Sequence, residues 1–173
     1  YLNSNEHLRQ SNEVETREQR LNKALMARYP LHGVKRWAPI MHRIRSRKTQ
    51  EEIQQIQNAI NITGKAFRRI LQFTKPGVME YEIEAEATHE FLRNGSRGHA
   101  YTPIVGSGYN ACVLHYITND SECKDGDVIL IDLGCEYGGY ASDMTRSIPV
   151  NGTFTPRQRD VYNAVLRVQK EAT

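Results

Sequence analysis

The chain has 173 residues, enough for one domain with a core or for a piece of a larger protein, and too few for several independent domains. Apolar residues make up 39% and charged residues 25% of it, so collagen-like and disordered classes are disfavoured. No apolar run reaches the ~18 residues of a membrane span, so we expect no membrane partner. The chain begins at Tyr1 rather than Met and stops at Thr173 inside a helical pattern; we therefore expect a piece of a longer protein.

Positive charge is concentrated near the amino terminus. Residues 1–50 hold 11 Lys and Arg against 4 Asp and Glu, whereas residues 51–173 hold 12 against 16. A basic arm can bind nucleic acid, but this one is interleaved with Trp37, Ile40 and Ile44, which is typical of a connector docked by its apolar side. We expect no nucleic-acid partner.

The cysteines indicate a reducing compartment. Three cysteines cannot all pair within one chain, and Cys112, Cys123 and Cys135 lack the C-x-x-C spacing of a zinc or redox motif. We therefore expect a cytoplasmic location.

The first half of the chain predicts helices. Residues 1–28 have an apolar stripe too narrow to fold alone, and Pro30, Gly33 and Pro39 predict a linker over residues 29–40. A helix that extends amino-terminal to the main domain is compatible with this pattern.

Two longer helices follow. The capping-box sequence at 49–52, with apolar residues at helical spacing after it, predicts an amphipathic helix that ends at 75–77. A second helix is expected over residues 79–93, with its acidic residues, Glu80 to Glu90, on a solvated face and Gly95 as its stop.

After residue 100 short apolar runs bounded by Gly, Asn and Asp predict strands. These runs cover residues 101–105, 112–116, 128–133 and 140–150. Gly138 and Gly139 predict a hairpin connection between the last two, and Thr155 with Pro156 predicts the start of a final helix. We expect Tyr101, Tyr109 and Tyr116 to divide between the core and a pocket wall.

Two aspartates near this hairpin are the strongest chemical signal. Asp132 directly follows four apolar residues, and because burial of an unpaired carboxylate costs several kcal/mol we expect a cationic partner. The hairpin brings Asp143 back beside it, and two carboxylates so close repel unless they share a proton or a cation. Oxygen ligands of this kind favour Mn²⁺, Mg²⁺ or Ca²⁺, and paired divalent ions are a hydrolytic arrangement.

The same residues resemble a known family. Residues 128–147, with 104–110 and the Leu114-His115-Tyr116 segment upstream, are similar to the first metal-ligand hairpin and the histidine segment of the Xaa-Pro aminopeptidases (aminopeptidase P), which are grouped with methionine aminopeptidase, prolidase and creatinase. The resemblance implies an α+β pita-bread fold, of which the chain would contain the first half: helices on a curved antiparallel sheet, with a helical amino-terminal extension. It implies two domains: the end of an amino-terminal domain with a connector in residues 1–42, and the first half of the catalytic domain in residues 43–173.

The resemblance also implies a site and an activity. Asp132 and Asp143 match metal ligands, with Asp143 bridging two divalent ions, usually Mn²⁺, and His115 matches the catalytic histidine that contacts substrate near the scissile bond. The implied reaction is hydrolysis, by metal-activated water, of the bond between an N-terminal residue and a following proline in a peptide. The family pattern needs a further His and two Glu that this chain does not supply, so we expect the chain alone to be inactive.

Two alternatives remain open. A prolidase-type dipeptidase would share these motifs, and some relatives of the fold are non-catalytic interaction modules without metal. Retention of both aspartates argues against an interaction module. We also expect a homo-oligomer, because the half-domain would leave apolar surface uncovered.

Overall fold

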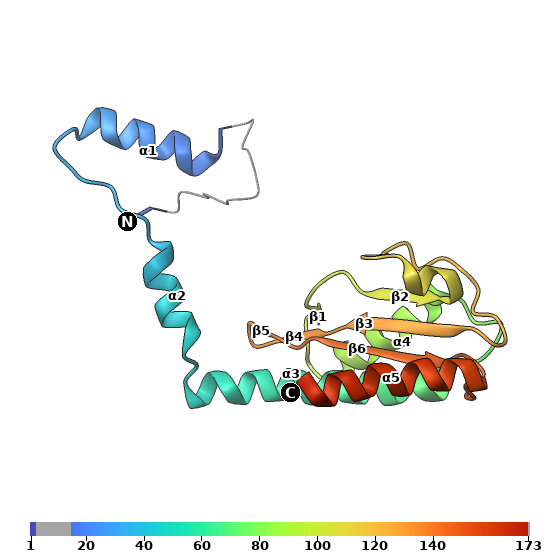
Figure 1. The fold of residues 1–173 in the computed structure, drawn as a ribbon. Coiled ribbons are helices and arrows are strands. Elements are labelled where there is room, and N and C mark those ends of the chain that lie inside the picture. Colours follow the sequence, from blue (N-terminus) through green and yellow to red (C-terminus); the bar gives the residue numbers. More distant parts are fainter. Residues whose placement is uncertain (3–14, 173) are drawn as a thin grey trace. The chain divides into compact units, whose positions relative to one another are not determined.

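A computed structural model describes residues 1–2 and 15–172, and its elements are shown in Figure 1. Close contacts divide the chain into two units, Tyr1–Thr49 and Gln50–Thr173. The first holds α1 (Arg17–Arg28) and α2 (Ala38–Ser46). The elements of the second, in chain order, are α3 (Gln50–Phe73), α4 (Glu80–Arg93), β1 (Gly98–His99), β2 (Ile104–Ser107), the 3-10 helix η1 (Gly108–Cys112), β3 (Val128–Leu133), β4 (Cys135–Tyr137), β5 (Tyr140–Ala141), β6 (Met144–Pro149) and α5 (Pro156–Ala172). Among the described residues, no helix is long and apolar enough to cross a membrane.

The helices of the first unit are held by local interactions. A capping box starts α1: the Gln19 amide donates to the Thr16 hydroxyl at 3.3 Å, and the Thr16 amide donates to the Gln19 side chain at 2.8 Å. The predicted linker is wrong at its end, because Pro39 lies in the first turn of α2. Amides of a first helical turn have no partner within the helix, so proline is tolerated there.

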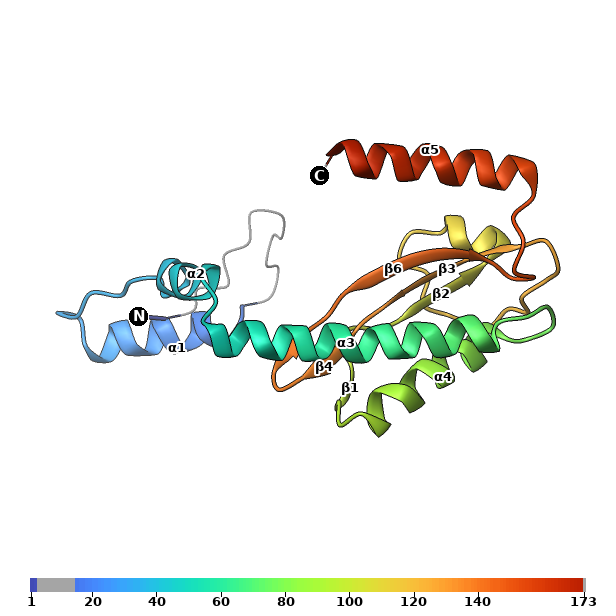
Figure 2. The same ribbon diagram turned by 90° about the horizontal axis from the view of Figure 1, so that it is seen from below.

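The two helices predicted over residues 49–93 are confirmed. In Figure 2, α3 and α4 lie on one side of the strands and α5 on the other. Phe91 and Ile70 are fully buried between the helices and the sheet, and each such side chain contributes about 1.5–3 kcal/mol by leaving water. The other apolar residues that these two helices bury are Ala59, Ile62, Ala66, Ile83 and Ala87.

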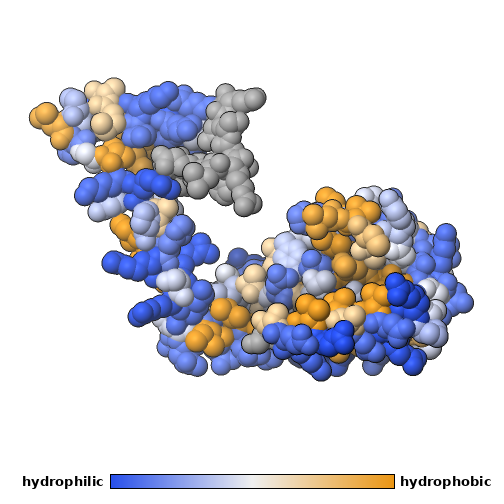
Figure 3. Space-filling model, in the orientation of Figure 1, coloured by the Kyte–Doolittle hydropathy of each residue, from blue (hydrophilic) through white to orange (hydrophobic). Residues whose placement is uncertain are grey.

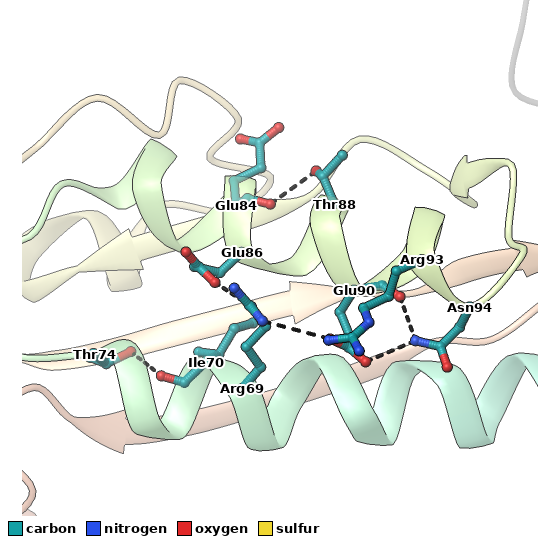
Figure 4. A network of polar contacts seen from close by, with 9 residues as sticks. All are labelled: Arg69, Ile70, Thr74, Glu84, Glu86, Thr88, Glu90, Arg93 and Asn94. Carbon is teal, nitrogen blue, oxygen red and sulfur yellow. Dashed lines mark hydrogen bonds and ion pairs between the residues drawn. The ribbon is translucent and has the colours of Figure 1, made fainter.

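The acidic residues of α4 do not form the solvated face that the sequence predicts. Figure 4 shows Glu86 paired with Arg69 of α3, while the Arg69 guanidinium lies 3.9 Å from Glu90. Glu90 and Glu80 are buried, Glu80 completely. The prediction fails because α4 packs against α3 on one side and against the segment after β2 on another, so its glutamates meet hydrogen-bond donors there.

The strands form two antiparallel three-stranded sheets, with orders β2-β3-β6 and β1-β4-β5. Along β3, Ile129, Ile131 and Leu133 are buried in the core, and the residues between them are half-buried on the opposite face. The predicted Gly138-Gly139 turn joins β4 and β5, and its φ angles of +61° and +85° suit the two-residue turn of a tight hairpin.

Two strand predictions are wrong. Residues 112–116 lie in η1 and the turn after it, with Leu114 86% exposed. This run lacks a neighbouring strand because the Asn110 side chain bonds the Tyr116 hydroxyl at 3.0 Å and folds the segment back on itself. The run 140–150 is not one strand but two, interrupted at Ser142 and Asp143.

The interruption coincides with a close passage of the chain. Gly134 lies between β3 and β4, and a Cβ atom at this position would stand 1.9 Å from the Ser142 carbonyl oxygen. Real Cβ atoms do not approach backbone so closely, and both residues are buried. Only glycine therefore allows the chain to cross from one sheet to the other here.

Gly134→Ala is expected to lower the free energy of unfolding by about 3 kcal/mol or more, since the added methyl group must displace backbone. Gly64→Ala is the matched control: its nearest neighbour is the end of the Arg68 side chain at 3.9 Å, and alanine favours the helix by about 1 kcal/mol. Urea unfolding of both variants tests this. Equal stability of Gly134→Ala and the unsubstituted chain would contradict the close passage.

Candidate metal centre

Asp132 and Asp143 lie on the same face of adjoining chain segments. Asp132 pairs with Thr145 across β3 and β6, and Asp143 precedes Thr145 by two residues, so the two aspartates are diagonal neighbours. One Oδ1 atom of each accepts from the same hydroxyl, that of Tyr101, at 2.7 Å for Asp132 and 2.8 Å for Asp143. The structure therefore brings the two predicted carboxylates together.

The cationic partner expected for Asp132 is not a side chain of the described residues. The carboxylate of Asp132 accepts a hydrogen bond from the phenol of Tyr101. Alternation along β3 explains this, since Asp132 falls on the half-buried face rather than in the core. There its desolvation is smaller than the sequence argument assumes.

Tyr101 has a single hydroxyl proton for two carboxylates. Burial raises its pKa above the ordinary value, and the bonds to Asp132 and Asp143 raise the pKa further. The phenol thus stays protonated and donates to one carboxylate at a time. The other carboxylate then receives no hydrogen bond from Tyr101, and a cation between the two carboxylates would relieve their mutual repulsion.

The donor set fits a hard divalent cation. Carboxylate oxygens suit Mg²⁺, Ca²⁺ and Mn²⁺, and no sulfur ligand accompanies them. Among residues 1–2 and 15–172, however, no group of three or more His, Cys, Asp and Glu side chains is gathered to hold a metal ion. Asp132 and Asp143 are thus two candidate ligands, and a binuclear centre needs more.

A buried hydroxyl pair fixes the backbone beside Asp143. The hydroxyls of Thr63, from α3, and Ser142 lie 2.7 Å apart, and both accept from the Cys135 amide, at 3.2 Å and 3.0 Å. The Ser142 amide donates to the Cys135 carbonyl at 3.0 Å. Because Ser142 directly precedes Asp143, α3 positions this aspartate through the hydroxyl pair.

The structure does not join His115 to the aspartates. His115 is exposed in the turn after η1 and has a φ of +56°. No hydrogen bond or ion pair connects it to either aspartate among the described residues. It therefore lies outside the carboxylate cluster, on a loop rather than on the strand that the sequence predicts.

Sequence reasoning missed the roles of Tyr101 and Thr63. The sequence predicts Tyr101 only as a residue of the core or of a pocket wall, and Thr63 carries no motif. The antiparallel pairing of β2 with β3 aligns Ile104 with Asp132 and leaves Tyr101 near the same end of the sheet. This register would have pointed to Tyr101, but it cannot be read from composition or periodicity alone.

The chain is similar to known proteins in both sequence and structure. The sequence profile of metallopeptidase family M24 matches residues 54–173. The chain belongs to this family. Its fold is that of the aminopeptidase P structures: proline aminopeptidase P II from Yersinia pestis superposes with a TM-score of 0.84 at 40% identity, over 92% of this chain and 39% of that one. An alanine variant of Escherichia coli aminopeptidase P in complex with substrate superposes with a TM-score of 0.78 at 45% identity, over 85% of this chain and 35% of that one.

Curated relatives point to the same group. The Xaa-Pro aminopeptidase of Escherichia coli is 50% identical over 130 residues, which is 75% of this chain and 30% of the relative. The Xaa-Pro dipeptidase of Mus musculus is 43% identical over 125 residues, or 69% of this chain and 25% of the relative. The chain thus spans about a third or less of these relatives' length. The predicted α+β pita-bread class and the predicted family are confirmed.

The hydroxyl pair can be tested with Thr63→Val, which keeps the shape of the side chain. Loss of the hydroxyl leaves the Cys135 amide and Ser142 with one partner fewer, at a cost of about 1–3 kcal/mol in the free energy of unfolding. Chemical denaturation measures this. Thr74→Val is the control: Thr74 directly follows α3 and its hydroxyl only donates to the carbonyl of Ile70 in the last turn of that helix. A loss as large as that of Thr63→Val would contradict a special role for Thr63.

Proposed function

We propose that the chain is the metal-binding first half of the catalytic domain of an Xaa-Pro aminopeptidase. The observation that carries the proposal is the convergence of Asp132 and Asp143 on one hydroxyl, in a chain of a metallopeptidase family. In this proposal the catalytic half begins at residue 43, and residues 1–42 belong to the end of a preceding domain and a connector. The whole enzyme works in the cytoplasm as a homo-oligomer.

Asp132 and Asp143 are the residues that would hold the metal, two divalent ions that we propose to be Mn²⁺. When bound, such ions supply a water activated for attack on the peptide carbonyl. The carboxylates contribute the negative charge that an amide could not. Tyr101 orients both by donating its one proton to either Oδ1 atom, and the hydroxyls of Thr63 and Ser142 hold the backbone beside Asp143.

His115 serves the substrate rather than the metal in this proposal. Its exposed position on the turn after η1 and its lack of a bond to the aspartates support that division. An imidazole there can donate to the peptide near the scissile bond, and preorganised donors of this kind contribute roughly 3–4 kcal/mol to catalysis.

The substrate class is a peptide with proline in the second position. The 50% identity with an Xaa-Pro aminopeptidase favours longer peptides, whereas the 43% identity with an Xaa-Pro dipeptidase keeps a prolidase-type activity as the second candidate. Cleavage of a proline dipeptide but not of a longer Xaa-Pro peptide by the complete enzyme would favour the dipeptidase. A non-catalytic module is less well supported, because it gains nothing from two carboxylates that repel each other.

In the complete enzyme, Asp132→Asn and Asp143→Asn are each expected to remove metal and activity together, because an amide has no charge to offset the cations. His115→Ala is expected to keep the metal and to lower kcat by about 100-fold or more. Elemental analysis and Xaa-Pro peptide cleavage, measured on the same samples, separate these outcomes.

Asp125→Asn is a suitable control, because Asp125 is exposed and bonds only the side chain of Asn151; metal content and turnover should stay unchanged. A His115→Ala enzyme without metal would show that this histidine is a ligand. A fully metallated, active Asp143→Asn enzyme would show that the two carboxylates are structural.

The 173-residue chain by itself is expected to be inactive, since two carboxylates do not complete a binuclear centre. Cleavage of an Xaa-Pro peptide is measured with added Mn²⁺ and with a chelator. Turnover by the pure chain that the chelator abolishes would disprove this expectation.

A further inference from the structure

Glu80 is a buried carboxylate at the start of α4, far in sequence from the aspartate pair. It is 0% exposed, and no cationic side chain pairs with it among the described residues. A buried charge without an ion pair is costly unless hydrogen bonds satisfy it. The hydrogen-bond donors around Glu80 therefore indicate the role of its carboxylate.

Four donors from one segment of the chain satisfy this carboxylate. The Ser107 amide and the Asn110 side chain donate to Oε1 at 2.7 Å and 3.2 Å. The Tyr116 hydroxyl and the Ser121 amide donate to Oε2 at 2.8 Å and 3.0 Å. All four donors lie between the end of β2 and residue 121, so Glu80 ties together both ends and the middle of the loop 107–121.

Apart from Glu80, the loop is anchored near its two ends. The Ser107 hydroxyl donates to Asp127. The buried Asn119 side chain bonds the Val105 amide, the Pro103 carbonyl and Glu84.

The middle of the loop, η1 and the turn after it, contains no strand, and Leu114 is 86% and Tyr109 84% exposed. His115 adopts the left-handed backbone conformation, with a φ of +56°, which is uncommon for a residue other than glycine and which histidine takes more readily than most. The residue that follows it, Tyr116, is bonded directly to Glu80.

We propose that Glu80 is a positioning residue for His115: its buried carboxylate holds the loop 107–121 in the one shape that presents the imidazole to the peptide substrate. The substrate role of His115 rests on the function proposed above. The anchoring of the loop by Glu80 is a separate claim and is tested separately.

The geometry requires a carboxylate and not merely a polar side chain. Each Glu80 oxygen accepts from one main-chain amide, Ser107 on Oε1 and Ser121 on Oε2. In Glu80→Gln, either orientation of the new amide turns its NH₂ group toward one of these N–H groups, and two donors then face each other. Glutamine therefore frees one end of the loop while it keeps the size of the side chain.

Glu84→Gln is the matched control. Glu84 is one turn further along α4, is half-buried, and accepts only from the side-chain amide of Asn119 at 2.9 Å. A glutamine oxygen can still accept this bond. Tyr116→Phe is a second, milder variant, since it removes the hydroxyl link and leaves the Glu80 carboxylate with its three other donors.

Hydrogen exchange of the chain tests the anchor without reference to activity. Glu80→Gln is expected to speed amide exchange in residues 107–121 at least about tenfold and to leave β3 and β6 unchanged. Tyr116→Phe should show a smaller increase in the same residues, and Glu84→Gln none. Unchanged exchange in 107–121 of both Glu80→Gln and Tyr116→Phe, or equal acceleration over all strands, overturns the anchor.

Kinetics of the complete enzyme test the link to His115. Glu80→Gln is expected to lower kcat for an Xaa-Pro peptide by about 10-fold to 100-fold, as for a misplaced catalytic group, with metal content unchanged. The double variant with His115→Ala should have a kcat no more than about twofold below that of His115→Ala alone, because both changes remove the same contribution, that of His115. Multiplied effects in the double variant, or loss of metal in Glu80→Gln, overturn the positioning role.

The two failures are distinguishable. An unsubstituted complete enzyme that cleaves no Xaa-Pro peptide overturns the proposed function, and with it the substrate role of His115, but leaves the exchange result standing. An active enzyme whose Glu80→Gln variant is fully active overturns the positioning role and leaves the proposed function intact.

Discussion

The crossing of the chain at Gly134 is the constraint on which the site depends. Without a Cβ atom, the backbone there passes against the Ser142 carbonyl, and this passage lets the β4-β5 hairpin turn out of the β2-β3-β6 sheet. Asp132 lies two residues before the crossing on one strand, and Asp143 follows it on the other. The two aspartates thus converge on Tyr101 because the chain changes sheets beside both of them. In a hairpin that stayed within one sheet, the strand pairing would continue past this point.

The two helices on one side of the sheets, α3 and α4, have related roles. From α3, Thr63 holds the crossing strands through a pair of buried hydroxyls, and from α4, Glu80 holds the loop after β2 through its carboxylate. Neither interaction is part of the packed apolar core. Buried polar networks that are fully satisfied specify one arrangement where apolar packing would allow several, and both networks are placed next to residues with proposed chemical roles.

Much of the fold could be predicted from the sequence because helices and tight turns are local. The long helix α3, the helix α4, the Gly138-Gly139 turn and the start of α5 at Pro156 all follow from caps, spacing and turn residues. The two errors about strands have one cause, which is that a strand needs a neighbour. The run 112–116 has none and becomes a loop, and the run 140–150 loses its neighbour where the hairpin leaves the sheet.

The site shows the same difference between local sequence patterns and long-range contacts. Asp132 and Asp143 stand out in the sequence because carboxylates interrupt or flank apolar runs, and their pairing follows from the hairpin. Tyr101, Thr63 and Glu80 act through contacts across 31, 79 and 27 residues of sequence. The sequence predicts Glu80 on a solvated face, since its place on a charged helix face looks like that of its neighbours. Only the fold shows which of several glutamates is buried.

The last helix differs from α3 and α4 in how it is stabilised. A capping box starts α5, with Gln158 and Thr155 bonded to each other at 2.9 Å and 3.3 Å, yet α5 buries no residue. Its valines, Val161, Val165 and Val168, are 47%, 64% and 64% exposed, and apolar residues are visible along α5 in Figure 3. In proteins most of the stability of a helix comes from the packing of its apolar face, which α5 lacks within the described residues. We therefore expect α5 to open at a lower free energy than the region around Gly134, which the core and the hydroxyl pair hold together.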